Sequence, residues 1–230
     1  MKKLNSFDIK LIMVTLMTMN HLGSIPNLFP DRLNVLITFS SRCVAPMFAF
    51  FAAKGIKKSN NIKSYCFRLS LLASIVQLGN MIISYIVKNG MNQMPPSVLG
   101  NSIIGIALSV DAIYLLDKYP RRKIIFFLSV IMFIIGFLYG EEGTVIVPII
   151  LLEYYFAEKS RARIIGYMLI EILAIVIPFG EPFFFLFIPF TFLYNGMEGK
   201  KTRFFYYYYP LHIWCIAILS ILSTMTIQSS

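Results

Sequence analysis

Long apolar runs separated by short polar connections make up nearly the whole of this 230-residue chain. A membrane-spanning helix needs about 20 apolar residues, within a range of about 17–25. The pattern therefore predicts an all-α fold, a polytopic transmembrane helix bundle with about nine spanning segments. Their bounds are roughly 7–25, 33–53, 64–87, 97–116, 123–139, 143–157, 163–179, 182–195 and 204–225. The sixth and eighth segments are short for a span, and we expect them to be tilted, broken or re-entrant.

The connections between these segments alternate in charge. Those on one side carry most of the basic residues, whereas the others hold only Arg32 and Lys88 together with several acids. Because cytoplasmic loops are enriched in Lys and Arg, the alternation predicts a cytoplasmic N-terminus and a C-terminus outside. The basic clusters are Lys2, Lys3 and Lys10; Lys54, Lys57, Lys58 and Lys63; Lys118, Arg121, Arg122 and Lys123; Lys159, Arg161 and Arg163; and Lys200, Lys201 and Arg203.

Composition supports a membrane protein and excludes an ordinary globular domain. The chain is 57% hydrophobic and 14% charged, against about 25% charged residues in soluble domains. A net charge of +10 could indicate nucleic-acid binding, but the charges lie in short clusters between apolar segments, as topology signals do. We therefore expect membrane lipids and no nucleic acid among the partners, and a multi-pass protein of the plasma membrane.

The connections are too short to hold an extramembrane domain, so we expect a single transmembrane domain over residues 1–230. No cleavage site follows the first apolar run, which we interpret as the first membrane helix rather than a signal peptide. Cys43, Cys66 and Cys215 lie inside apolar segments without metal-ligand spacing, so we expect packed free thiols and no metal site.

A few ionisable residues lie at membrane depth, where such groups are costly and mark functional sites by default. At 1.5 Å per helical residue, His21 lies roughly 20 Å from the cytoplasmic start of the first segment, and His212 roughly 12 Å from that of the ninth. Arg42 lies about 14 Å below the outer start of the second segment, so the three could converge. The full set is His21, Arg42, Arg68, Asp111, Glu153, Glu171 and His212.

His21 and Arg42 each allow two interpretations. His21 is either a histidine satisfied by a backbone carbonyl or a general base, since its unperturbed titration lies nearest to neutral pH. Arg42 stays charged, so it either pairs with Asp111, Glu153 or Glu171 or binds an anion. Pro46 is expected to loosen the helix near Arg42.

The remaining groups are less distinctive. Arg68 can extend its charge to the headgroups. The buried acids are expected to pair with buried cations or to join polar networks, and Glu171 is the strongest candidate for a further role. His212 follows four tyrosines, residues 206–209, and Pro210. The tyrosines suggest an interfacial aromatic belt, while the proline and the histidine suggest the wall of a polar cavity.

An ordered set of landmarks along the chain resembles the TraX family of integral-membrane acetyltransferases, which is related to membrane acyltransferases that modify cell-surface sugars. Each element is weak alone, and the order and spacing make the resemblance specific. The elements are Met19–Gly23 (MNHLG), Arg42–Phe50 (RCVAPMFAF), Lys54–Lys58 (KGIKK), Tyr65–Gln77 (YCFRLSLLASIVQ), Asn101–Ser109 (NSIIGIALS), Tyr139–Gly143 (YGEEG) and Phe205–His212 (FYYYYPLH).

The resemblance implies a CoA-dependent O- or N-acetyltransferase that moves an acetyl group from cytoplasmic acetyl-CoA to a peptide amine or a glycan hydroxyl. It implies a catalytic base at His21, with Arg42 and His212 as further catalytic residues. Two positions depart from the family pattern: Asn20 replaces the frequent Asp before the histidine, and Leu138 replaces an acid. Arg42, Arg68, Tyr209, Lys54 and Lys58 are expected to contact the acetyl-CoA.

Two other functions remain open at the level of sequence. A transporter or flippase could line its path with Arg42 and the buried acids, although no internal repeat is evident. A non-catalytic membrane scaffold would need none of His21, Arg42 and His212.

Overall fold

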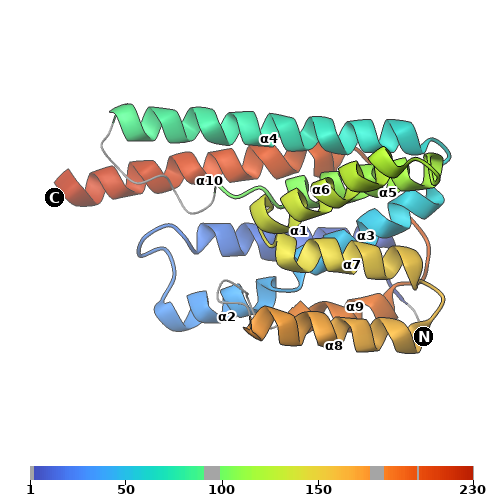
Figure 1. Ribbon diagram of the computed structural model, residues 1–230. Coiled ribbons are helices and arrows are strands. Elements are labelled where there is room, and N and C mark those ends of the chain that lie inside the picture. The colour runs from blue at the N-terminus through green and yellow to red at the C-terminus, as the bar shows by residue number, and fades with distance from the viewer. Residues whose placement is uncertain (1–2, 91–98, 177–183, 201, 230) are drawn as a thin grey trace. The chain divides into compact units, whose positions relative to one another are not determined.

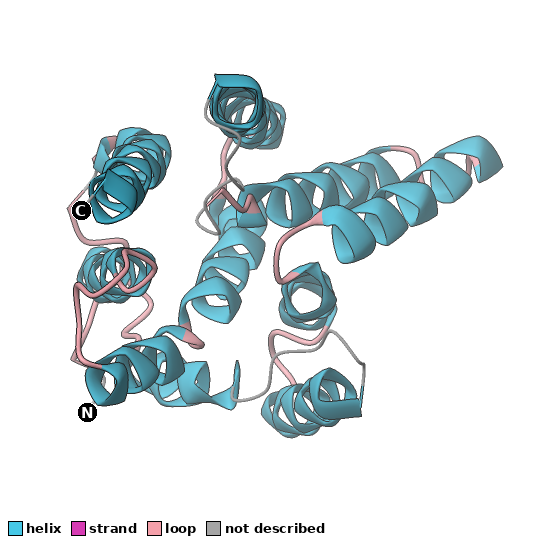
Figure 2. Cartoon of the chain, turned by 90° about the vertical axis from the view of Figure 1, so that its left-hand side faces the viewer, coloured by secondary structure: helices cyan, strands magenta, loops and turns pink. Residues whose placement is uncertain are grey.

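The computed structural model describes residues 3–90, 99–176, 184–200 and 202–229, and most of them are helical (Figure 1). The β-structure within these ranges is one isolated bridge between Leu4 and Tyr194, and Figure 2 shows helices and loops elsewhere. The predicted all-α fold is confirmed for the described residues. In chain order the helices are α1 (Ser6–Leu22), α2 (Asp31–Ser41), α3 (Val44–Lys58), α4 (Ile62–Gly90), α5 (Ser102–Lys118), α6 (Lys123–Tyr139), α7 (Gly143–Tyr155), α8 (Ser160–Val176), the 3₁₀-helix η1 (Phe184–Phe187), α9 (Ile188–Leu193) and α10 (Phe204–Ser229).

Each predicted apolar segment coincides with one helix or with two consecutive helices. The second segment is divided into α2 and α3, and the eighth contains η1 and α9. The sixth segment is α7, which has 13 residues and includes Pro148. Residues 97–98, 177–179 and 182–183, at the edges of three predicted segments, lie outside the described ranges.

Three helical stretches in the described part of the chain are long and apolar enough to cross a membrane: Asp31–Lys58, Ile62–Lys88 and Phe204–Met225. The other helices are shorter, yet several expose large apolar side chains. On α6, for example, Ile124 is 76% exposed and Phe127 is 64% exposed. Contiguous exposed apolar surface of this kind is typical of a face that contacts lipid or another protein. The helices are therefore those of a membrane protein, and the nine spans and their orientation stay a prediction.

A turn at Arg42 and Cys43 interrupts the second predicted segment. Helix α2 ends at Ser41, the backbone N–H of Arg42 bonds to the Phe39 carbonyl, and α3 begins at Val44. Pro46 therefore lies in the first turn of α3, where its missing N–H costs no helical hydrogen bond. The break agrees with the prediction that Pro46 loosens the helix near Arg42, because a proline cannot donate a hydrogen bond to the carbonyl four residues earlier, which here is that of Arg42.

Contacts between Cα atoms divide the chain into two compact units, of which only the described residues are considered below. Unit 1 comprises residues 1–44, 74–100 and 193–230, and unit 2 comprises residues 45–73 and 101–192. The boundary passes through α4, so the two units share that helix.

In unit 1, the start of α1 is fixed against the segment before α10. Asn5 caps α1 in a capping box with Asp8. The backbone N–H of Ser6 bonds to the Met197 carbonyl at 2.9 Å, and the Ser6 hydroxyl bonds to the Glu198 carbonyl at 3.0 Å. This end of the unit therefore gathers the N-terminal residues and the connection that precedes α10.

In unit 2, α5 packs closely against α6 and α7. Glycines face one another at this contact: a side-chain carbon added at Gly105 would lie 3.3 Å from the Gly136 carbonyl oxygen. Small residues that let backbones approach are typical of helix contacts within membranes.

The ends of the helices in unit 2 are sorted by charge. At one end, Tyr154 of α7 donates a hydrogen bond to Asp117 of α5, and the Lys57 ammonium of α3 lies 5.2 Å from the Tyr154 ring centroid. At the other end, the Ser102 hydroxyl bonds to Glu141 at 3.2 Å, in the turn between α6 and α7. The ends of α3, α5 and α7 therefore lie together, and the basic connections that follow them start from the same end of unit 2.

Candidate functional site

The two histidines of the chain meet in unit 1. The ring centroids of His21, near the end of α1, and His212, in α10, lie 5.3 Å apart. Along the same contact, the rings of Phe7 and Phe205 lie 5.8 Å apart. Contacts therefore advance in the same direction along both helices, and α1 and α10 run parallel. The structure thus brings together two of the three residues that the sequence selected as catalytic.

Tyr208 connects α10 to α1 beside this pair. Its hydroxyl lies 2.7 Å from the Thr18 hydroxyl, which also bonds to the Val14 carbonyl at 2.8 Å. A carbonyl can only accept, so Thr18 donates to Val14 and Tyr208 donates to Thr18. These bonds hold the Tyr208 ring in place one helical turn before His212.

The His212 ring stacks on that tyrosine. Its plane makes an angle of 12° with the Tyr208 ring at a centroid distance of 5.0 Å, and the Tyr209 ring meets it edge-on at 5.8 Å. Phe204 continues the row, 5.0 Å from Tyr208. Residues four apart lie on the same face of a helix, so Phe204, Tyr208 and His212 form one aromatic row.

Hydrogen bonding defines the tautomer of neutral His212. Its Nδ1 lies 2.9 Å from the Tyr208 carbonyl oxygen, which can only accept, so Nδ1 carries the proton. Nε2 then presents a lone pair. His212 is 7% exposed, and Nε2 is buried with no hydrogen-bond partner in the part of the chain that the structure describes. A buried acceptor without a partner is costly and needs an explanation, and a ligand that donates a hydrogen bond supplies one.

Arg42, the third predicted catalytic residue, caps α2 and is half-buried. Its neighbour Cys43 is buried, with its thiol 3.2 Å from the Ser40 carbonyl and 3.8 Å from the Met13 sulfur of α1. The ring and hydrogen-bond contacts of the two histidines described above do not include Arg42. Arg42 therefore lies in the turn between α2 and α3, and the contact of Cys43 with Met13 holds this turn against α1.

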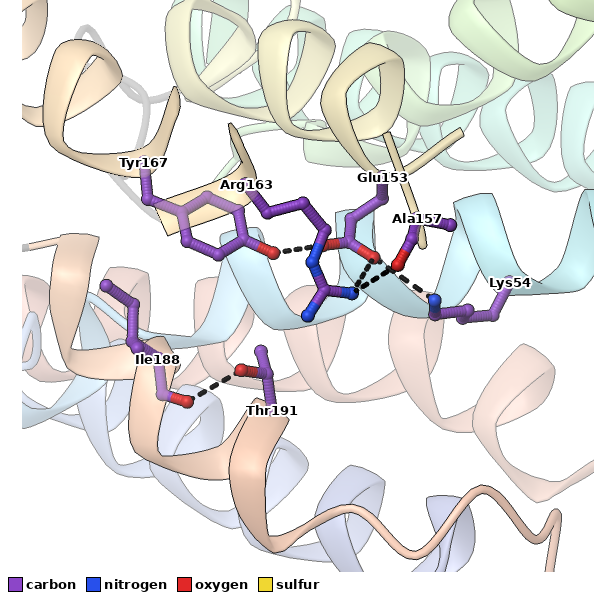
Figure 3. A network of polar contacts seen from close by, with 7 residues as sticks. All are labelled: Lys54, Glu153, Ala157, Arg163, Tyr167, Ile188 and Thr191. Carbon is purple, nitrogen blue, oxygen red and sulfur yellow. Dashed lines mark hydrogen bonds and ion pairs between the residues drawn. The ribbon is translucent and has the colours of Figure 1, made fainter. Parts of the chain in front are cut away.

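A second polar cluster lies in unit 2, at the basic end (Figure 3). The Glu153 carboxylate of α7 is 0% exposed and pairs with the Lys54 ammonium and the Arg163 guanidinium, both at 3.3 Å. Tyr167 donates its hydroxyl hydrogen bond to the same carboxylate. The Tyr167 ring packs edge-on against Phe187 at 4.8 Å. Lys54, predicted to contact acetyl-CoA, thus lies in an ion-pair cluster, and Glu153 has the cation partners predicted for a buried acid.

The other predicted residues have neighbours of their own. The Arg68 guanidinium bonds to the Ser64 hydroxyl at 2.7 Å on an exposed face, and Lys58 is exposed at the end of α3. Asp111 accepts a hydrogen bond from Ser70 at 2.5 Å, and Glu171 accepts one from the Phe185 backbone at 3.2 Å. No group of three or more His, Cys, Asp or Glu that could hold a metal occurs among the described residues.

The sequence alone did not single out Tyr208 or Arg163, and Thr18 stood out only as a polar neighbour of His21. The four-residue spacing of Tyr208 and His212, and the three-residue spacing of Thr18 and His21, were signals, because each places two residues on one face of a helix. Arg163 carried no such signal, since it is one of several basic residues in the connection before α8.

The helices and the two polar clusters define a helical membrane protein with ionisable groups inside its apolar segments. The chain belongs to the TraX family: the sequence model of the family described as TraX protein matches residues 6–222. No curated protein and no solved structure matches the chain.

Proposed function

We propose that this protein is an integral-membrane acetyltransferase of the plasma membrane that uses acetyl-CoA as donor and the amino terminus of a peptide as the favoured acceptor. A glycan hydroxyl is the second acceptor class. Membership of the TraX family supports the proposal. The observation that carries it is the His21–His212 pair, in which Nε2 of His212 is buried without a partner among the described residues.

The histidine pair would act as the base. A neutral acceptor amine attacks the thioester carbonyl carbon, so a C–N bond forms and the C–S bond breaks. The proton lost by the amine passes to the imidazole pair and from there to the departing CoA thiolate. Nε2 of His212 is suited to receive it, because the Tyr208 carbonyl holds the ring with its proton on Nδ1. His21 lies against this ring, within reach of the same acceptor.

Arg42 would stabilise negative charge. A guanidinium keeps its charge at membrane depth and suits either the oxyanion that forms on the thioester carbonyl or a phosphate of the donor. Its place before the start of α3 at Val44 supports this role, because the amino end of a helix attracts anions.

The donor would enter from the cytoplasm at the basic ends of the helices. In unit 2 these ends carry Lys54, Lys57 and Arg163. By the positive-inside rule these ends face the cytoplasm.

The test is an assay of the purified protein in lipid nanodiscs with radiolabelled acetyl-CoA and an extract of cell-envelope peptides. The variants are His21→Ala and His212→Asn, whose amide can still donate to the Tyr208 carbonyl. Loss of a positioned general base should lower the rate about 10²- to 10⁴-fold. Thr15→Ala is the matched control, because this exposed side chain of α1 bonds only within its own helix, to Leu11.

Label in a peptide or glycan, lost in both histidine variants and retained in the control, supports the proposal. Full activity of both histidine variants would remove the pair from the mechanism. A protein that neither binds nor hydrolyses acetyl-CoA is not an acetyltransferase, and this is the result expected of a transporter.

A further inference from the structure

The cluster in unit 2 leaves one edge of the Arg163 guanidinium unused. Both hydrogen bonds of Arg163 come from Nη1, to Glu153 at 3.3 Å and to the Ala157 carbonyl at 3.2 Å. Nε is buried and has no hydrogen-bond partner within the described ranges. In Figure 3 the Nε side of the guanidinium faces away from Lys54. The edge formed by Nε and Nη2 is one that can bind an oxyanion through two parallel hydrogen bonds.

The charges of the cluster also do not balance. Lys54 and Arg163 are two cations that share the single carboxylate of Glu153, and the third group on that carboxylate is the neutral phenol of Tyr167. An excess positive charge that is largely removed from water is unfavourable unless an anion compensates it. The lysine and arginine side chains keep 22% and 19% of their surface exposed, so a ligand can reach the cluster.

The position of Arg163 in helix α8 also favours a negatively charged ligand. It lies in the first turn of α8, which begins at Ser160, and the amino end of a helix attracts anions. Because Nε is covered, the guanidinium must turn for a ligand to reach it. This rotation of the side chain breaks only the two hydrogen bonds that Nη1 donates, and both have lengths at the upper end of the usual range.

We propose that the cluster of Lys54, Glu153, Arg163 and Tyr167 is a binding site for a phosphate group, with Arg163 as the residue that recognises it. The assignment to a phosphate of the CoA donor rests on the proposed function. An anionic lipid headgroup presents the same chemistry, and the experiment separates the two sources.

The experiment measures the affinity of the purified protein for CoA in phosphatidylcholine nanodiscs by isothermal titration calorimetry. Arg163→Lys keeps the charge beside Glu153 and removes the two-pronged edge, so CoA should bind about tenfold more weakly or worse. Arg161→Lys is the matched control, since Arg161 is an exposed arginine in the same turn of α8, and its affinity should stay within about twofold of the unchanged protein.

A second variant should act in the opposite direction. Glu153→Gln keeps the shape of the side chain and an acceptor for Tyr167, and it removes the negative charge that competes with the ligand. CoA should then bind more tightly than it does to the unchanged protein, which a merely structural role of the cluster would not produce. Equal or weaker binding by a folded Glu153→Gln protein would overturn the site.

The remaining outcomes are also decisive. Unchanged affinity in Arg163→Lys, or equal losses in Arg163→Lys and Arg161→Lys, would show that no phosphate binds there. If the unchanged protein binds no CoA, the proposed function fails. The site is then tested by the rise in thermal stability when phosphatidylglycerol replaces phosphatidylcholine. A rise lost only in Arg163→Lys assigns the site to a lipid phosphate, and a rise retained there, or no rise, overturns it.

Discussion

At the scale of single residues, Asn80 shows how a polar side chain is accommodated inside unit 1. It is 4% exposed, and its amide nitrogen donates to the carbonyls of Leu99 and Gly100 at 3.0 and 3.2 Å. Its oxygen accepts the indole N–H of Trp214 at 3.1 Å. Each end of the amide therefore has a partner, and the side chain connects α4, α10 and the segment before α5.

Removal of this amide should destabilise the protein. Asn80→Ala leaves the Trp214 N–H and two carbonyls without their partner, and one such buried group costs about 1–3 kcal/mol. We expect a loss of about 2 kcal/mol in the free energy of unfolding, measured by denaturation in mixed micelles. Asn60→Ala, at an exposed asparagine in the turn after α3, should change it by less than about 0.5 kcal/mol.

A double-mutant cycle isolates the bond to Trp214. Trp214→Phe removes the N–H itself, so Asn80→Ala should cost less in that background, with a coupling of about 1 kcal/mol. Additive effects would show that the indole bond contributes nothing to stability.

The residue types of the site could be predicted from the sequence, but their contacts could not. His21 and His212 were identifiable because ionisable side chains are rare in apolar segments, and that rarity needs no structure. Their contact depends on how α1 packs against α10, and the tautomer of His212 depends on the Tyr208 carbonyl. Arg163 differs from its basic neighbours only through Glu153, which lies ten positions earlier and on another helix.

At the scale of helices, the close contact of α5, α6 and α7 depends on where glycine occurs. A side-chain carbon at Gly143 would clash with the Gly136 carbonyl oxygen and lie 2.8 Å from that of Phe137. At Gly136 the nearest atom would be a Val147 methyl at 3.4 Å, which is an ordinary contact. The two glycines lie at one interface. Only at Gly143 do backbone atoms, which cannot move aside, exclude a larger residue.

Gly143→Ala should therefore separate the start of α7 from the end of α6 and destabilise the protein by about 1–3 kcal/mol. Gly136→Ala should be neutral or slightly stabilising, because alanine favours a helix by about 1 kcal/mol over glycine. Thermal unfolding of both variants in the same detergent provides the comparison. Equal destabilisation of the two variants would show that glycine is required at both positions for close helix packing, and not at Gly143 alone because of a clash with the backbone.

Helix positions were predictable because apolar runs and basic clusters mark both the length and the ends of membrane helices. For the second segment, Pro46 predicted a helix loosened near Arg42, but not that one helix ends there and another begins. That proline is compatible with the first turn of α3, so the chain breaks before it and the helix resumes at Val44.

At the scale of the whole molecule, the number of spans determines which connections face the cytoplasm. With nine spans and a cytoplasmic N-terminus, residue 60 faces the cytoplasm and residue 141 faces outside. With only Asp31–Lys58, Ile62–Lys88 and Phe204–Met225 as spans, both positions change sides while the C-terminus stays outside. A reporter at the C-terminus therefore cannot distinguish the two arrangements, whereas labels at these two connections can.

Labelling of single cysteines decides between them. The background carries serine at Cys43, Cys66 and Cys215, and Asn60→Cys or Glu141→Cys is added. Nine spans predict that a membrane-impermeant maleimide labels the Glu141→Cys protein in intact cells and the Asn60→Cys protein only after lysis. Three spans predict the reverse.

The exposed apolar surface of α6 is unfavourable in a protein with only three spans. With three spans, α6 would expose Ile124, Phe126 and Phe127 to water, and each is more than half exposed. Apolar surface in water costs about 25 cal/mol per Å² relative to lipid, so this face alone would cost several kcal/mol. At 17 residues, α5, α6 and α8 lie at the short limit for a span, and local thinning of the bilayer costs only fractions of a kcal/mol per Å. For these three helices burial in lipid is thus the smaller cost, and labelling of Glu141→Cys in intact cells is the expected result.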